Sequence, residues 1–68
     1  MNAWDYGFSE GVAFIEAYGD NTSVSQYRQI GKQKAEQYVK SDRQVAYYQG
    51  WLRAAGLEDR LEESKKTA

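Results

Sequence analysis

Aromatic side chains beside an arginine, late in the chain, are the residues best suited to form a binding site. The residues expected to face a core recur there at helical spacing: Val45, Tyr48 and Leu52. Tyr47 and Trp51 would then point about 100° away, one turn apart, as an exposed ridge. Because Trp, Tyr and Arg dominate interface energetics, the sequence predicts a protein-binding face formed by Tyr47, Trp51 and Arg53. The alternative is that Trp51 covers the end of the core and packs on the first helix.

A second group of residues could bind nucleic acid, because basic side chains neutralise phosphates and tyrosine rings stack on unpaired bases. These residues interleave in one segment: Tyr27, Arg28, Lys32, Tyr38, Lys40 and Arg43. Residues 1–20, however, carry four acidic and no basic side chains, whereas residues 21–53 carry six basic and two acidic ones. The two fields either cancel on solvated faces or form one two-signed binding surface. Since the acidic segment would repel phosphates, RNA is the alternative partner and protein the preferred one.

An active site is poorly supported by the residue types present. The chain contains no Cys and no His, which removes thiolate and imidazole nucleophiles, bases and zinc ligands. Carboxylates such as Glu10 and Glu16 show no pattern of burial that would tune a pKa, and they are expected to be solvated. The turn at 19–21 offers too few oxygen donors for calcium. The sequence therefore predicts a protein that is not an enzyme and that holds no metal or cofactor.

Three amphipathic segments are expected to position these residues in an all-α domain. The first runs from Ala3 to Tyr18, the second from Val24 to Val39 and the third from Asp42 to Ala55. Ser23 and Ser41 each precede a glutamine by three residues, which is the capping-box spacing of a helix start. The pattern therefore predicts three consecutive helices, although the chain contains no proline to mark their boundaries.

Four glycines have expected structural roles. Gly19 and Gly56 suit the left-handed residue just past a helix end. Gly7 and Gly11 lie on the apolar face of the first segment, although each costs about 1 kcal/mol in a helix relative to alanine. Their spacing makes a groove into which another helix would pack, either from the same chain or from a second copy in a homodimer.

One or two helices could cover residues 24–55. Apolar or small residues repeat there every seven positions, as in a coiled coil: Val24, Gly31, Tyr38, Val45 and Leu52. A continuous helix would be about 50 Å long and would need a partner chain to cover it. The positions three residues later are not regularly apolar, which favours a break near Ser41. The sequence predicts a three-helix domain over residues 1–61, with a short fourth turn at Leu57 and Leu61, and a flexible tail over 62–68.

Membrane and export signals are not recognisable in the chain. No apolar run approaches the roughly 18 residues of a membrane helix. Met1 is followed by neither a basic region nor an apolar region of the kind that makes a signal peptide. A cytoplasmic protein without a membrane partner is therefore expected.

Two short motifs resemble the ribosome modulation factor family, small bacterial and phage-type proteins built from two helices and a connector. Residues 8–13, Phe-Ser-Glu-Gly-Val-Ala, resemble the aromatic-x-x-Gly-aliphatic-Ala turn of that family's first helix. Residues 48–54, Tyr-Gln-Gly-Trp-Leu-Arg-Ala, are similar to its aromatic-x-Gly-Trp-x-x-Ala segment. The resemblance implies binding to a ribosomal RNA surface and silencing of translation. The connector is longer here and lacks the family's Pro-Tyr, and the net charge of −1 contrasts with a strongly basic family.

The predicted function is a non-enzymatic module that docks on a larger protein or ribonucleoprotein complex and inhibits or modulates it. The absence of catalytic residue types, the ten aromatic rings in 68 residues and the polarised charge all favour this class. By analogy, tiny proteins of this class are often inhibitors of a host system encoded by phages or mobile elements. The alternative is a ribosome- or RNA-binding modulator of translation.

Overall fold

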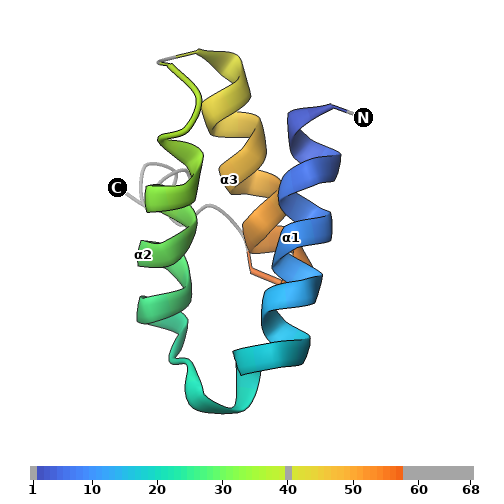
Figure 1. The fold of residues 1–68 in the computed structure, drawn as a ribbon, viewed down its shortest axis with the longest axis vertical. Coiled ribbons are helices and arrows are strands. Elements are labelled where there is room, and N and C mark those ends of the chain that lie inside the picture. The colour runs from blue at the N-terminus through green and yellow to red at the C-terminus, as the bar shows by residue number, and fades with distance from the viewer. Residues whose placement is uncertain (1, 40, 58–68) are drawn as a thin grey trace, which may run out of the picture.

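Three helices make up the all-α domain seen in the computed structural model, which describes residues 2–39 and 41–57 (Figure 1). Their bounds are Ala3–Tyr18 for α1, Val24–Ala35 for α2 and Asp42–Ala54 for α3, with a 3-10 turn, η1, at Gly19–Asn21. Residues 24–55 form two helices, α2 and α3, and not one continuous helix. The prediction of a compact three-helix domain is therefore confirmed. Lys40, Leu61 and the predicted tail over 62–68 lie outside the described residues.

Polar side chains start each helix. The Asn2 side chain accepts a hydrogen bond from the Asp5 amide at 2.8 Å. Ser23 and Gln26 form the expected capping box, with bonds of 3.1 and 3.0 Å. Ser41 does cap α3, but it accepts from the Arg43 amide at 3.2 Å. The Gln44 side chain instead donates to the Tyr38 carbonyl, so the second capping box is wrong in detail while its helix start is right.

Helix ends differ from the sequence pattern at two places. Helix α2 stops at Ala35 rather than Val39, because the next three amides bond to carbonyls three residues back and tighten the chain into a turn. Gly19 has a helical φ of −55° and leads into η1, so its expected left-handed role is wrong. Gly56 has φ of 73° directly after α3, which confirms it as the glycine that ends this helix.

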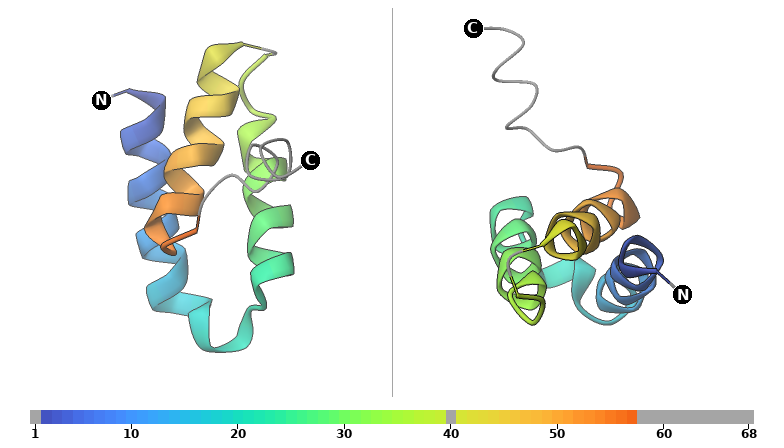
Figure 2. Two further views of the ribbon diagram at one scale, coloured as in Figure 1. Left: turned by 180° about the vertical axis from the view of Figure 1, so that it is seen from behind. Right: turned by 90° about the horizontal axis from the view of Figure 1, so that it is seen from above.

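Helix α3 lies between the other two helices (Figure 2). It runs parallel to α1, with α2 antiparallel to both. Both α1 and α2 pack against α3, while the Cα atoms of α1 stay more than 8 Å from those of α2. The third helix is therefore the centre of the fold, and the residues on its inner face decide the core.

Glycines bring α1 and α3 unusually close together. A Cβ atom at Gly7 would collide with the Tyr47 carbonyl, and one at Gly11 would lie 2.7 Å from the Ala54 side chain. From the other side, a Cβ at Gly50 would lie 2.9 Å from the Phe8 amide nitrogen. The groove predicted at Gly7 and Gly11 is thus filled by the chain's own third helix. The homodimer that would have used this groove has no room there.

The inner face of α3 differs from the one that the sequence pattern suggested. Tyr47 and Trp51 have no exposed surface, and Leu52 is also buried. Val45, which was expected to face the core, is 54% exposed. The reason is that Gly50 admits α1, which turns the residues beside that glycine inward. The exposed ridge predicted for Tyr47 and Trp51 is therefore wrong. Trp51 does contact the first helix, with its ring centroid 5.4 Å from that of Phe14, but it lies inside the core and does not cover its end.

None of the helices within residues 2–39 and 41–57 is long and apolar enough to cross a membrane.

Candidate functional site

Trp51 is held in the centre of the domain by a reciprocal pair of hydrogen bonds. Its indole Nε1 donates to the Tyr27 carbonyl at 2.8 Å, and the Tyr27 hydroxyl donates to the Trp51 carbonyl at 2.5 Å. The two rings stack with centroids 4.7 Å apart, and Gly31 leaves room for the indole. Burial raises the pKa of the Tyr27 hydroxyl to about 12. Tyr27 is thus a core residue, and its predicted role in stacking on a base is wrong.

Tyr47 forms a second polar contact, which is partly buried, with a carboxylate of α1. Its hydroxyl donates to Glu10, and burial together with this hydrogen bond raises the pKa of Tyr47. Hydrogen bonding to Glu10 also raises the pKa of Tyr6. The expectation that Glu10 is a solvated side chain is wrong, since it is partly buried between α1 and α3. Both tyrosines stay protonated at neutral pH, so this cluster links helices and supplies no nucleophile.

Arg53 alone of the predicted protein-binding residues is exposed. The two aromatic rings meant to form the centre of that face are enclosed, so Arg53 has no apolar anchor from Tyr47 or Trp51 beside it. The signal that could have revealed this is the spacing of Tyr47, Gly50, Trp51 and Ala54. Those four positions follow the i, i+3, i+4, i+7 pattern of a buried helix face around a glycine.

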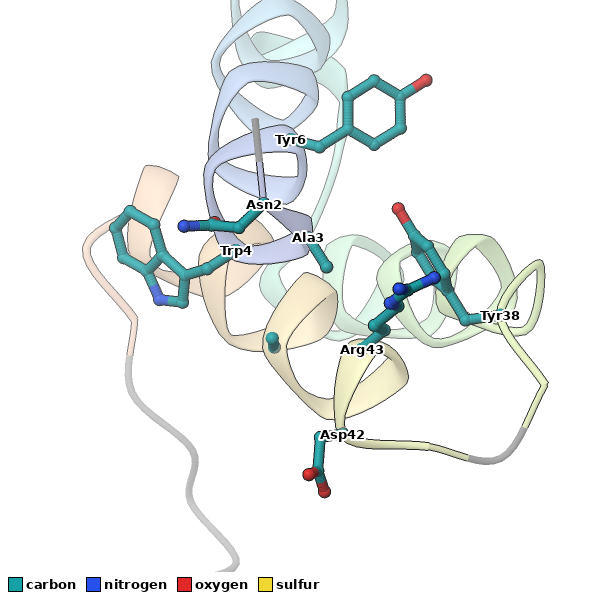
Figure 3. Close-up of a pocket in the computed structure, with 8 residues that line it drawn as sticks. Asn2, Ala3, Trp4, Tyr6, Tyr38, Asp42 and Arg43 are labelled. Carbon is teal, nitrogen blue, oxygen red and sulfur yellow. The ribbon is translucent and has the colours of Figure 1, made fainter.

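An open hollow at one end of the bundle brings together two of the predicted nucleic-acid-binding residues. Tyr38 and Arg43 line it with Tyr6, on one side of α1 (Figure 3). Its volume is about 730 Å³, and Trp4 and Asp42 also contribute to the lining. Aromatic rings beside a guanidinium can contact an unpaired base and its phosphate.

The other predicted nucleic-acid-binding residues do not join this hollow. Arg28 and Lys32 lie one turn apart on α2, and Lys32 is exposed. Arg28 is partly buried, and its Nε atom has no hydrogen-bond partner among the residues that the structure describes. Lys40 lies outside the described residues, and of the predicted residues that the structure does describe, Tyr38 and Arg43 alone meet at this hollow.

A row of large apolar side chains is exposed on α1. Trp4, Phe8 and Val12, which we call the α1 stripe, are 37%, 37% and 36% exposed. Each is one turn from the next, and the Trp4 and Phe8 rings stack at 5.4 Å with only 11° between their planes. Gly7 and Gly11, not these large residues, take the position against α3. The available signal was that α1 is apolar over more of its circumference than one neighbouring helix can cover.

Metal binding has no support within the described part of the chain, which holds no group of three or more Asp or Glu residues placed to share an ion. Comparison with known proteins found no matching family model, no similar curated protein and no similar solved structure.

Proposed function

We propose that this protein is a non-enzymatic binding module that docks on a larger protein assembly through the α1 stripe and thereby inhibits or modulates it. The observation that carries the proposal is the stripe itself, with its stacked exposed rings of Trp4 and Phe8. Contiguous apolar surface on a small protein is costly to leave in water, and a partner surface is a natural cover. Large aromatic anchors are also the residues that dominate binding energy at interfaces.

The backbone beneath the α1 stripe supports this role because it is fixed. The close contacts of Gly7 and Gly11 with α3 hold α1 in place along the length of the stripe. Stacking of Trp4 on Phe8 further restricts both rings before any partner arrives. A surface that is already ordered loses less conformational entropy on binding, which favours affinity.

The action of such a module is to occupy a surface, since neither the residue types nor the buried tyrosines supply an activity. We place it in the cytoplasm. By analogy of size and chemistry alone, we propose that the protein is an inhibitor of a host system, of the kind that phages and mobile elements encode.

A pull-down from lysate compares the purified protein with Phe8→Ala, which removes the central ring of the stripe. Loss of that anchor should weaken capture of the partner by about 2 kcal/mol or more, roughly 30-fold, while the fold survives. Val24→Ala is the matched control, because Val24 is an exposed apolar residue on α2, outside the stripe. Equal capture by Phe8→Ala and the parent protein would refute the proposal.

RNA binding is the second candidate function, supported by the hollow that Tyr38 and Arg43 line and by the resemblance to the ribosome modulation factor family. It ranks second because Asp42 lines the same hollow and would repel phosphate. Affinity for structured RNA should fall steeply as salt rises, and Arg43→Gln should weaken it more than Arg53→Gln does. An absence of RNA binding even at low salt would remove this candidate.

A further inference from the structure

We infer that the partner of the α1 stripe is a basic amphipathic helix of another protein, with Lys or Arg along one edge of its apolar face. The inference rests on the proposed function and adds the chemistry of the partner. It follows from the charges that border the stripe and from the shape of the stripe itself.

Carboxylates border the outer edge of the stripe. At 100° per residue, Asp5 and Glu16 lie within about 40° of Val12, on the side away from the glycines. Both side chains are exposed, whereas Glu10 on the opposite side of α1 is engaged by Tyr47. Helix α1 contains no Lys or Arg to neutralise them. The outer edge therefore presents a negative field that no basic residue of α1 compensates, beside the apolar anchors.

The inner edge of the stripe has a different charge. Gly50 of α3 faces the backbone at Trp4 and Phe8, and Arg53 follows one turn later on α3 as an exposed cation. A partner with basic residues on both edges would meet Arg53 and be repelled there. The charges on the two edges therefore favour a partner helix with basic residues along one edge only. That basic edge must lie over Asp5 and Glu16, on the side of the stripe away from Arg53.

Other covers of the stripe are disfavoured by the same charges. An anionic lipid surface or a nucleic acid would meet Asp5 and Glu16 with like charge. A second copy docked through the same patch with its α1 antiparallel, about a two-fold axis perpendicular to the helix, would bring acidic edges close to each other. The stripe extends for about 12 Å along α1, which matches two turns of a partner helix packed against it.

Two synthetic helical peptides with identical leucine positions test the inference, one carrying Lys and Arg along one edge and the other Glu at the same places. Each is labelled and titrated with the full chain, with fluorescence anisotropy as the readout. We expect the basic peptide to bind at least tenfold more tightly at low salt, with the difference shrinking as salt rises. Phe8→Ala should abolish binding of both peptides.

A charge swap on the protein provides the stricter comparison. Asp5→Lys combined with Glu16→Lys should reverse the preference and favour the acidic peptide. Asp20→Lys combined with Glu36→Lys makes the same change in net charge at exposed positions away from the stripe, and it should leave the preference largely intact. An equal effect of both double variants would show that net charge, not the edge of the stripe, decides the preference, and would overturn the inference.

The remaining outcomes separate this inference from the proposed function. If neither peptide binds, or both bind equally, while Phe8→Ala still loses its partner from lysate, the stripe is an interface but its partner is not a basic helix. If sedimentation shows a dimer that Phe8→Ala dissociates, a second copy covers the stripe and the inference is wrong. If Phe8→Ala affects neither peptide binding nor capture, both the inference and the proposed function fail.

Discussion

Replacement of Gly50 by alanine probes the contact on which the fold depends. The new Cβ atom would lie 2.9 Å from the Phe8 amide nitrogen and 3.0 Å from the Trp4 carbonyl carbon, and closer still to the Trp4 carbonyl oxygen. Ordinary contacts of this kind begin at 3.4 Å. Because the atoms that it meets belong to a helix backbone, no rotamer change can relieve the collision, and α1 must move away from α3.

The expected cost is the difference between two effects. Overpacking a close contact costs about 1 to 3 kcal/mol and occasionally more. Alanine in place of glycine returns about 1 kcal/mol of helix propensity. Since displacement of α1 also loosens the packing of its neighbours on Tyr47 and Trp51, we expect a net destabilisation of about 1 to 2 kcal/mol. For a domain of this size, each kcal/mol lowers Tm by roughly 4 to 8 °C.

Thermal and urea unfolding followed by circular dichroism measure this effect. Gly19→Ala is the matched control, because Gly19 has helical φ and a Cβ there would meet only the Ile15 side chain, at 3.1 Å. That variant should be about as stable as the parent. Gly7→Ala and Gly50→Ala disturb the same interface, so their combined effect should be smaller than the sum of the two. A Gly50→Ala protein as stable as the parent would refute the close packing of α1 on α3.

Three further predictions concern the core, its tyrosines and a helix cap. Trp51→Ala should lower the free energy of unfolding in urea by about 3 to 5 kcal/mol, which is a large part of the stability of a 68-residue chain. A surface change such as Trp4→Ala should lower it far less. Similar losses for the two variants would contradict the buried position of Trp51. Stability should fall as the pH rises above 10 and through about 12, because tyrosines of the unfolded chain ionise near 10 while the pKa of Tyr27 is about 12. Unfolding free energies that match at pH 9 and pH 11.5 would argue against this, and Tyr27→Phe should show a weaker dependence. Ser23→Ala should cost about 1 kcal/mol, since it removes the side-chain acceptor of the α2 capping box, and an unchanged urea midpoint would contradict that role.

Helix positions were accessible from sequence because local chemistry sets them. The predicted start and end of α1 match the structure, and the serines at 23 and 41 mark the starts of α2 and α3. The end of α2 was placed four residues late because Tyr38 continues the apolar spacing of that segment. Tyr38 contributes to the core from the turn after the helix, where its ring lies 5.7 Å from that of Tyr47.

Which face of α3 is buried could not be read from hydrophobicity alone. The pattern of Val45, Tyr48 and Leu52 is apolar at helical spacing, yet Val45 is largely exposed. A glycine adds nothing to an apolar pattern, but Gly50 is the residue that lets α1 approach. The exposed ridge was predicted wrongly for the same reason, because Tyr47 and Trp51 lie beside that glycine and are buried, while the glycines on α1 take the inner positions and leave Trp4 and Phe8 outside.

The parallel packing of α1 on α3 has a consequence for the kinetics of folding. The closest helix contacts join residues about forty positions apart in the chain, such as Gly7 and Tyr47. Their formation requires closure of a long loop, whereas α2 adds contacts of shorter range. The contact order is therefore high for a helical protein, and slower folding than that of an ordinary small bundle follows. During synthesis, α1 also stays without its packing partner until α3 has emerged from the ribosome.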